Sequence, residues 1–236
     1  MGSSIDSGSA NLEAMDAAKA YQAAMTRLLV STLGLPAGLV LDYGAGTGAY
    51  TRMAAQARPR WTVHALEPNR ALHRHFGSGA RAFASLDELL PGSLDAAFSL
   101  NVFEHIQDDV RALEHLAACC KPGAPIFLLV PAHMSLWSPM DDLVGHARRY
   151  GLSQLEELGL AAGLRVAASG WFDGTGYLAT KAYRLAARSG LLTRVDGTIT
   201  ARQVQAFDRV FSVCEPILSA LRAPLGKNCW VKLTAV

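Results

Sequence analysis

The chain has 236 residues, of which half are apolar and 18% are charged, and its formal net charge is +2 at pH 7. A nearly neutral chain lacks the positive field that draws proteins to nucleic acid, so the composition argues against a nucleic-acid partner. The length fits one domain, and we expect a single domain over residues 1–236.

The ends of the chain and its cysteines bear on its location. Residues 1–11 are rich in Gly and Ser, which predicts a disordered tail, and they lack the basic start and apolar run of a signal peptide. No apolar run approaches the ~20 residues that a transmembrane helix needs. The four cysteines show no zinc-binding spacing. This pattern favours reduced thiols in a cytoplasmic protein, and we predict no metal site.

The first expected elements are a helix and a short strand. Apolar side chains recur at helical spacing over Leu12–Leu33, and Gly34 and Pro36 follow, so we predict an amphipathic helix there. The apolar run Leu39–Leu41 has the length and bounds of a buried strand.

Three glycines follow this strand and its final acid, Asp42. Gly44, Gly46 and Gly48 alternate with small residues, and a helix is expected over Ala49–Arg58. Glycine is needed where the backbone has a positive φ or where a ligand approaches the main chain, and a helix N-terminus presents free N–H groups to that ligand. Strand, glycine turn and helix are typical of the entrance to a nucleotide-binding α/β unit.

Two acids narrow the choice of ligand. Asp42 lies two residues before the first glycine, where its carboxylate would repel a pyrophosphate but suits the ammonium and sulfonium groups of S-adenosylmethionine. The second expected strand, Thr62–Leu66, ends at Glu67, which Pro68 follows. An acid ~20 residues beyond the glycines is placed to accept hydrogen bonds from ribose hydroxyls. Glu67 therefore indicates a nucleoside, and it is compatible with NAD as well as with S-adenosylmethionine.

The rest of the chain continues the alternation of strands and helices. Further strands are expected over 80–85, 94–100, 125–131 and 164–168, and further helices over 108–120 and 152–162, the latter capped by Ser153. The run 125–131 is nearly all apolar, as are parallel strands that are covered on both faces. These elements predict a doubly wound α/β sheet.

Two stretches resemble motifs of the class I S-adenosylmethionine-dependent methyltransferases. The run from Asp42 to Gly48 resembles motif I, and the run Asn101–Ile106 resembles motif IV. The resemblance implies a methyl-transfer enzyme with S-adenosyl-L-methionine as cofactor and S-adenosyl-L-homocysteine as product. It also implies a seven-stranded Rossmann-like sheet whose last strand, Asn228–Thr234, is antiparallel. The cofactor-binding residues that it implies are Asp42, Gly44, Ala45, Gly46, Gly48, Glu67, Pro68, Ser85, Leu86, Asn101 and Val102.

Motif IV also contains Glu104 and His105, which look like an acid–base pair. In the family that this stretch resembles, the equivalent residues are usually structural, and that is the role we favour.

The segment from Pro131 to Tyr150 is expected to be a loop beyond the fifth strand, where loops carry function. Its Asp-x-x-x-Gly-His-x-Arg-Arg-Tyr pattern resembles a subgroup of bacterial methyltransferases associated with glycan and natural-product pathways. As an active-site lid, the loop would supply His133, Asp142 or His146 as a general base, and we favour the two histidines as catalytic residues. The substrate-binding residues that we expect are Tyr21, Trp137, Asp142, Arg148, Arg149 and Tyr150.

Two other interpretations of this loop stay open. In the first, Asp141 and Asp142 pair with Arg148 and Arg149 and only fix the loop. In the second, Asp and His side chains bind a metal ion, although no helical spacing of histidines supports such a site.

About 58 residues separate the sixth and seventh strands, where the resemblance implies a short link. This insertion, residues 169–227, is expected to contain helices over Gly176–Arg188 and Thr200–Arg222. Lys181, Arg184 and Arg188 form a basic stripe on the first helix. The insertion is interpreted as a helical cap on the sheet, a substrate lid, a dimer surface, or a contact with an anionic membrane that bears a lipid-linked substrate.

Three functions are compatible with the sequence. The first is methyl transfer by a monomer or homodimer to a small-molecule acceptor, at an oxygen or nitrogen of a glycan, lipid-linked or natural-product intermediate. The second is an NAD(P)-dependent oxidoreductase, because Tyr177-x-x-x-Lys181 matches the catalytic pair of short-chain dehydrogenases, although it follows the sixth strand rather than the fifth. The third is a non-catalytic partner subunit with the same fold.

Overall fold

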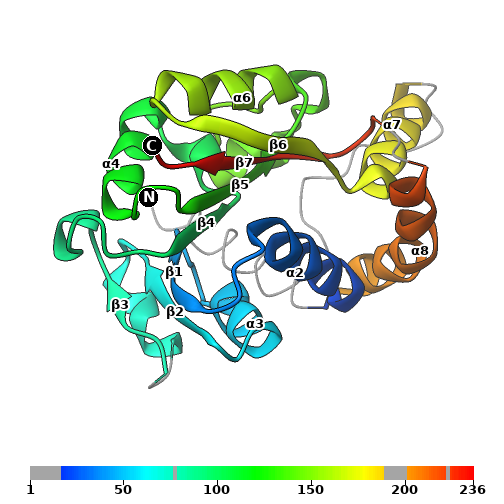
Figure 1. Ribbon diagram of the computed structural model, residues 1–236. Helices are drawn as coiled ribbons and strands as arrows, with labels where there is room; N and C mark the ends of the chain where they lie inside the picture. Colours follow the sequence, from blue (N-terminus) through cyan, green and yellow to red (C-terminus); the bar gives the residue numbers. More distant parts are fainter. Residues whose placement is uncertain (1–16, 77–78, 189–200, 222–223) are drawn as a thin grey trace.

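The computed structural model describes residues 17–76, 79–188, 201–221 and 224–236 (Figure 1). The predicted tail, residues 1–11, and the first part of the predicted N-terminal helix lie outside these ranges. None of the helices within them is both long and apolar enough to cross a membrane.

A single seven-stranded sheet forms the centre of the described structure. Its strands are β1 (Gly38–Tyr43), β2 (Trp61–Leu66), β3 (Ala82–Phe83), β4 (Ala96–Leu100), β5 (Pro125–Pro131), β6 (Arg165–Phe172) and β7 (Asn228–Thr234). The strand order is β3-β2-β1-β4-β5-β7-β6, and β7 is antiparallel to both of its neighbours while the other pairs are parallel. This topology confirms the predicted doubly wound, Rossmann-like sheet with an antiparallel last strand.

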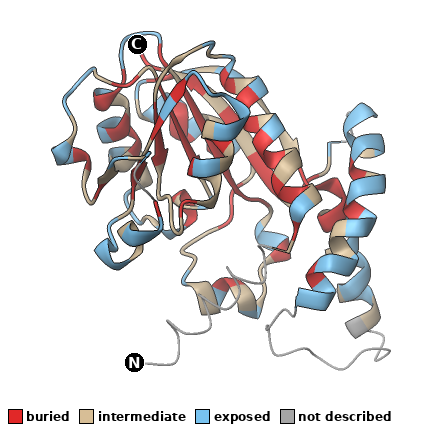
Figure 2. Cartoon of the chain, turned by 90° about the horizontal axis from the view of Figure 1, so that it is seen from below, coloured by how far each residue is buried: buried red, intermediate tan, exposed pale blue. Residues whose placement is uncertain are grey.

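Helices cover both faces of the sheet (Figure 1). They are α2 (Lys19–Leu33), α3 (Ala49–Ala57), α4 (Asp109–Cys119), α5 (Pro139–Val144), α6 (Leu152–Ala161), α7 (Gly174–Arg188) and α8 (Ala201–Ala220). Because successive side chains of a strand point to opposite faces, Val40 belongs to the core cluster that includes α2, α3 and α8, while Leu41 belongs to the cluster that includes α4 and α6. The central strands are buried on both faces, and exposed residues lie on the outer sides of the helices (Figure 2).

Helix α8 ties two other helices to the domain through buried or half-buried carboxylates. The Asp208 carboxylate accepts hydrogen bonds from the backbone N–H groups of Ala20 and Tyr21, each at 2.9 Å, at the N-terminus of α2. The Glu215 carboxylate accepts from the three successive backbone N–H groups of residues 173–175, at 3.0–3.2 Å, at the N-terminus of α7. Both acids complement free N–H groups and the positive end of a helix dipole.

The predicted loop between β5 and α6 was wrong in part, because it contains a 3-10 turn, Met134–Leu136, and the helix α5. The Asp141 carboxylate accepts hydrogen bonds from the backbone N–H and the hydroxyl of Ser138, at 2.8 and 2.9 Å, and Pro139 occupies the first turn. Gly145 ends α5 with a φ of 76°. Ser at the cap, Pro after it, an acid three residues on and Gly at the end are known helix signals, and they were present in the sequence.

Three smaller boundaries also differ from the prediction. Strand β3 has only two residues, and β6 extends to Phe172, so the helical insertion begins at Asp173. Helix α6 is capped at Gly151 rather than at Ser153, because the Gln154 side chain accepts the Gly151 N–H at 2.8 Å.

Candidate active site

The glycine turn between β1 and α3 has a backbone that only glycine adopts readily. Gly44, Gly46 and Gly48 have φ values of 80°, 55° and 73°. A Cβ on Gly44 would lie 2.3 Å from a methyl carbon of Val102, whereas a Cβ on Gly46 would meet no atom within 4 Å. The turn is therefore packed against motif IV at its first glycine and open at its second, which is the cradle that a ligand touching the main chain requires.

Asp42 lies beneath this turn and is buried, with 3% of its surface exposed. Its carboxylate accepts a hydrogen bond from the Thr51 hydroxyl at 2.6 Å. Burial raises the pKa of Asp42 from 3.8 to about 7, against the opposing effect of the Thr51 bond. Thr51, on α3, is thus the partner that holds this acid in place, and nothing in the sequence alone distinguished it.

We expect Asp42→Asn to stabilise the protein increasingly as the pH rises. The pKa of Asp42 is raised in the folded chain, so the folded state keeps a proton between about pH 4 and 7 that the unfolded state loses, and stability falls as pH rises through this window. Asparagine does not titrate and still accepts from Thr51. The difference in unfolding free energy between variant and wild type should therefore grow by about 2–3 kcal/mol from pH 5 to pH 8.

Denaturant titrations of the two proteins at both pH values measure this difference. Asp173 and Glu104, whose pKa values burial raises to about 6 and about 8, titrate in both proteins and cancel in the comparison. A difference that stays constant with pH would show that Asp42 is ionised in the folded chain.

Glu67 follows β2 and faces the same turn. Its two carboxylate oxygens accept backbone N–H groups of Gly46 and Asn69, each at 2.9 Å. Pro68, beside it, is exposed. The acid that the sequence predicted for the ribose is therefore brought against the open glycine, 21 residues earlier in the chain.

Two of the predicted cofactor-binding residues, Ser85 and Leu86, lie after β3. Ser85 caps a short 3-10 turn by accepting the Asp87 N–H at 3.2 Å, and Leu86 is buried in the core. These contacts give both residues local structural roles in the protein.

At the end of β4, Asn101 has a φ of 55° and its side chain is exposed, while its N–H donates to the Leu129 carbonyl at 2.8 Å. A positive φ at a residue other than glycine is strained, and such strain gathers at functional sites. Val102 follows it and packs on Gly44. The two predicted regions, motif I and motif IV, are thus in direct contact at the carboxyl edge of the sheet, where open α/β sheets bind ligands.

The loop that was predicted to carry substrate-binding residues is built around a buried ion pair. Arg149 donates from Nε and Nη2 to the two carboxylate oxygens of Asp141, at 2.7 and 3.1 Å, and from Nη1 to the Ala132 carbonyl at 3.1 Å. Asp141 is fully buried and Arg149 is 8% exposed. This pairing agrees with the structural interpretation of the loop for Asp141 and Arg149, since the guanidinium is already bound on both sides.

Asp141 also contacts His146, one of the two predicted bases. The His146 Nδ1 lies 2.7 Å from an Asp141 oxygen, and its Nε2 lies 3.8 Å from a Glu104 oxygen. The Arg149 and His146 partners help to hold the pKa of Asp141 well below its usual range, although burial acts in the opposite direction.

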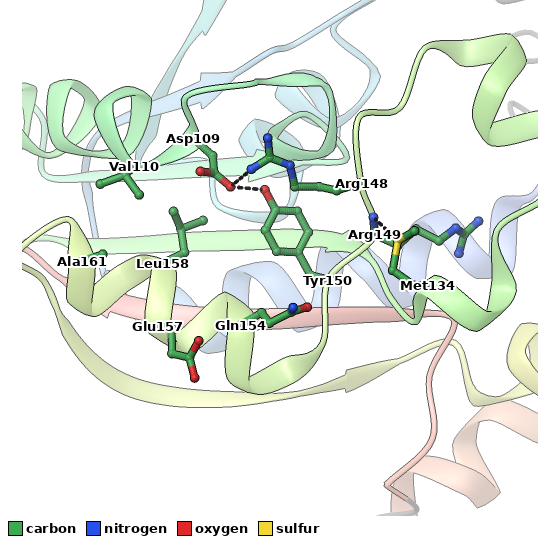
Figure 3. A pocket seen from close by; sticks show the side chains of 10 residues that line it. All are labelled: Asp109, Val110, Met134, Arg148, Arg149, Tyr150, Gln154, Glu157, Leu158 and Ala161. Carbon is green, nitrogen blue, oxygen red and sulfur yellow. Dashed lines mark hydrogen bonds and ion pairs between the residues drawn. The ribbon is translucent and has the colours of Figure 1, made fainter.

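Arg148 and Tyr150 share a different acid. Both reach the same oxygen of Asp109, on α4, at 2.6 and 2.7 Å, and the Tyr150 hydroxyl also lies 3.1 Å from the Phe103 carbonyl. They line a pocket of about 420 Å³ between α4, α6 and the loop (Figure 3). The other residues that line it are Asp109, Val110, Met134, Arg149, Gln154, Glu157, Leu158 and Ala161. The glycine turn does not line this pocket, so Arg148 and Tyr150 are separate from the cofactor cradle.

His133, the second predicted base, follows β5. It has a φ of 62°, and its ring stacks on Trp171 with centroids 4.7 Å apart. Its Nε2 is buried and makes no hydrogen bond within the described part of the chain. Burial lowers the pKa of His133, and the nearby Lys181 lowers it further, which favours the neutral form of the ring.

The remaining predicted substrate residues have local partners. The Trp137 indole N–H donates to Asp142 at 3.0 Å. Tyr21 is 7% exposed, its hydroxyl accepts from the Asn228 amide at 2.9 Å, and its ring lies among Phe172, Phe207 and Phe211. The structure therefore places Tyr21 in the core between α2 and α8.

A family model described as a methyltransferase domain matches residues 15–169, well over half of the chain. The chain belongs to this methyltransferase family. The match covers the glycine turn, Glu67 and motif IV, and it confirms the predicted family together with its cofactor, S-adenosyl-L-methionine. A comparison with curated protein sequences finds no match.

Solved structures share the methyltransferase fold at low sequence identity. An S-adenosylmethionine-dependent methyltransferase from Mesorhizobium loti is 14% identical, with a TM-score of 0.55 over 89% of this chain and 95% of that one. The Haemonchus contortus phosphoethanolamine N-methyltransferase 2, solved with S-adenosyl-L-methionine, is 19% identical, with a TM-score of 0.56 over 89% of this chain and 51% of that one. A chain from the complex between the Haloferax volcanii Trm112 methyltransferase activator and a methyltransferase is 15% identical, with a TM-score of 0.60 over 92% of this chain and 93% of that one.

Proposed function

We propose that the protein transfers a methyl group from S-adenosyl-L-methionine to an oxygen or nitrogen of a small-molecule glycan, lipid-linked or natural-product intermediate. The observation that carries the proposal is the open side of Gly46, which lies between Glu67 and the N-terminus of α3 above Asp42. Asp42 and the glycine turn would hold the aminoacyl end of the cofactor, and Glu67 would hold the ribose.

The cofactor supplies a methyl group already activated on a sulfonium, so positioning contributes most of the catalysis. Alignment in a closed cleft contributes up to ~7–11 kcal/mol. For a hydroxyl acceptor, a general base adds about 10²–10⁴-fold. Of the two predicted bases, we favour His133, because its Nε2 has no partner within the described residues and its lowered pKa favours the neutral form, while the His146 Nε2 lies 3.8 Å from the buried Glu104 carboxylate.

Glu67→Ala should weaken S-adenosyl-L-homocysteine binding at least tenfold, because each lost charge-assisted hydrogen bond costs about 1.5–3 kcal/mol. Titration calorimetry of the full chain measures this, with Glu114→Ala as control, since Glu114 is an exposed acid on α4. An unchanged affinity would show that the ribose assignment is wrong. Titration of the wild type with NAD completes the test: tight NAD binding without S-adenosyl-L-homocysteine binding would favour the oxidoreductase.

The two alternatives lack comparable support. Tyr177 and Lys181 lie on α7, after the edge strand β6, and the Lys181 ammonium lies over the Tyr177 ring at 5.5 Å. The third candidate function is a non-catalytic partner subunit, and one structural neighbour is a complex between a methyltransferase activator and a methyltransferase. Cofactor binding without turnover on any acceptor, together with a stable complex with another protein, would favour that role.

We further propose that residues 1–236 form one domain whose insertion contacts an anionic membrane surface. Val210, Val213 and Ile217 recur at helical spacing on α8, Leu221 continues the row, and their side chains are 54–72% exposed. Arg202 and Arg209 are exposed along one edge of this row. In the described parts of α7 and α8 no acidic side chain is exposed, because the Asp208 and Glu215 carboxylates cap α2 and α7. A basic helix with an apolar face suits an anionic bilayer.

Cosedimentation with vesicles tests this surface. The protein should pellet with phosphatidylglycerol vesicles more than with phosphatidylcholine vesicles, and Val213→Asp/Ile217→Asp should abolish the difference. Leu160→Asp, at an equally exposed leucine on α6, is the matched control and should not change it. If the double variant instead converts a dimer into a monomer in light scattering, without any vesicle binding by the wild type, the surface joins two copies of the chain and the membrane proposal fails.

A further inference from the structure

Glu104 is a buried carboxylate that the protein leaves without a hydrogen-bond partner. It lies in the 3-10 turn Phe103–His105 directly after β4 and is 0% exposed. Within the described residues, neither carboxylate oxygen accepts a hydrogen bond. Leaving such a group unpaired is costly, so a carboxylate in this position calls for a positively charged or protonated partner.

The charged groups nearest to Glu104 do not supply that partner. The Arg149 guanidinium is bound to both oxygens of Asp141 and to a backbone carbonyl. Asp141 itself is a second negative charge facing Glu104, and it acts against ionisation of Glu104.

Two histidines instead converge on Glu104. The His146 Nε2 lies 3.8 Å from a Glu104 oxygen, and the rings of His105 and His146 lie edge to face with centroids 4.8 Å apart. One nitrogen from each histidine and one oxygen of Glu104 lie within 4.8 Å of one another. A carboxylate oxygen and two imidazole nitrogens are donors that first-row divalent metal ions prefer.

Each histidine is also held from behind through its other ring nitrogen. The His146 Nδ1 lies 2.7 Å from an Asp141 oxygen, and the His105 Nδ1 lies 3.2 Å from the Gly145 carbonyl. Acceptors at Nδ1 fix the proton there and leave Nε2 free as a ligand. Histidines that bind metals almost always have such a carboxylate or carbonyl behind them.

We propose that Glu104, His105 and His146 form a binding site for a divalent first-row transition-metal ion, with Asp141 and the Gly145 carbonyl orienting the two histidines. Three protein donors leave at least one coordination position open. Metal–ligand bonds of ~2.0–2.2 Å require the donors to move closer together by a small amount, which the exposed ring of His105 allows. The sequence did not reveal the site, because His105 and His146 lie 41 positions apart and share no helix. The site does not depend on the proposed methyl transfer.

Titration of the full, metal-free chain with Zn²⁺ and with Co²⁺ tests the site. The wild type should bind one Zn²⁺ ion by calorimetry and give visible Co²⁺ absorption bands. His105→Gln and Glu104→Gln should each weaken Zn²⁺ binding at least ~10-fold. His115→Gln is the matched control, since His115 is a half-exposed histidine on α4 that pairs with Asp87, and it should bind as the wild type does.

The decisive variant is His105→Gln, because His105 is exposed and its replacement leaves the core intact, whereas Glu104→Gln must first be shown to fold by circular dichroism. Wild-type Zn²⁺ affinity in His105→Gln would overturn the site. A near-ultraviolet thiolate-to-cobalt band would place the ion at a cysteine and would also overturn it. Titration of the same samples with S-adenosyl-L-homocysteine separates the two proposals: normal cofactor binding without Zn²⁺ binding refutes the metal site alone.

Discussion

Asp141→Asn is expected to lower the free energy of unfolding by about 3–5 kcal/mol, because it leaves a buried guanidinium without its charge partner. Asp141 accepts two hydrogen bonds from Arg149, a third contact from His146, and two more from Ser138 at the start of α5. The amide keeps part of the helix cap but cancels the charge that balances Arg149. Equilibrium unfolding in denaturant at neutral pH measures the loss.

Asp142→Asn is the matched control for this prediction. Asp142 is the next residue along the same helix, but it is exposed, and its carboxylate accepts only the Trp137 indole N–H among the described contacts. Its substitution should change stability by no more than ~1 kcal/mol. Equal losses in the two variants would mean that the buried pair does not hold the loop. Because the pKa of Asp141 is depressed in the folded chain, Asp141 contributes to the free energy of unfolding at neutral pH. This contribution is lost in acid, as the pH falls below about 4, the pKa of Asp in the unfolded chain.

Gly44→Ala is expected to cost about 2–5 kcal/mol of stability, well above the cost of the same change two residues later. At Gly44 the new Cβ meets a Val102 methyl at 2.3 Å and also carries the strain of a φ of 80°. At Gly46 the backbone strain remains, but the new Cβ enters open space, so Gly46→Ala should cost only about 1–2 kcal/mol.

Adding Val102→Ala to each glycine variant separates the clash with Val102 from the strain of the positive φ. It should recover most of the loss in Gly44→Ala, because it removes the methyl groups that clash, and it should not improve Gly46→Ala. Thermal or denaturant unfolding of the wild type, of Val102→Ala, and of each glycine variant with and without Val102→Ala measures these changes in stability. Equal destabilisation by the two alanines would contradict the packing of motif I on motif IV. Gly46→Ala should nevertheless bind S-adenosyl-L-homocysteine at least tenfold more weakly, since its methyl group narrows the cradle.

The features that the sequence predicted correctly are those with a local physical cause. Strand β7 was placed at Asn228–Thr234 with the right bounds, and the turn of Gly44 to Gly48 was recognised because only glycine tolerates its backbone. Glu67 was predicted to lie at the end of the second strand, and it follows β2. The structure brings it to Gly46, as parallel strands that end at one edge of a sheet require.

The features that the sequence could not predict depend on contacts between distant segments. Arg148 and Arg149 are neighbours with the same chemistry, yet one pairs with Asp109 on α4 and the other with Asp141 on α5. Tyr21 was expected to bind the substrate, and only the position of α8 reveals that its ring lies among aromatic side chains. Helix α5 differs in kind, because its capping signals were local and were overlooked.

The caps that α8 provides make the insertion inseparable from the rest of the domain. Asp208 holds the start of α2, near the beginning of the described chain, and Glu215 holds the start of α7, so one helix from the insertion organises two others. Replacement of residues 173–227 by a short hairpin would leave the N-terminus of α2 without its cap and would expose the ring of Tyr21. The insertion therefore cannot be exchanged between relatives as an independent module unless its replacement also supplies the carboxylate of Asp208 to the N-terminus of α2.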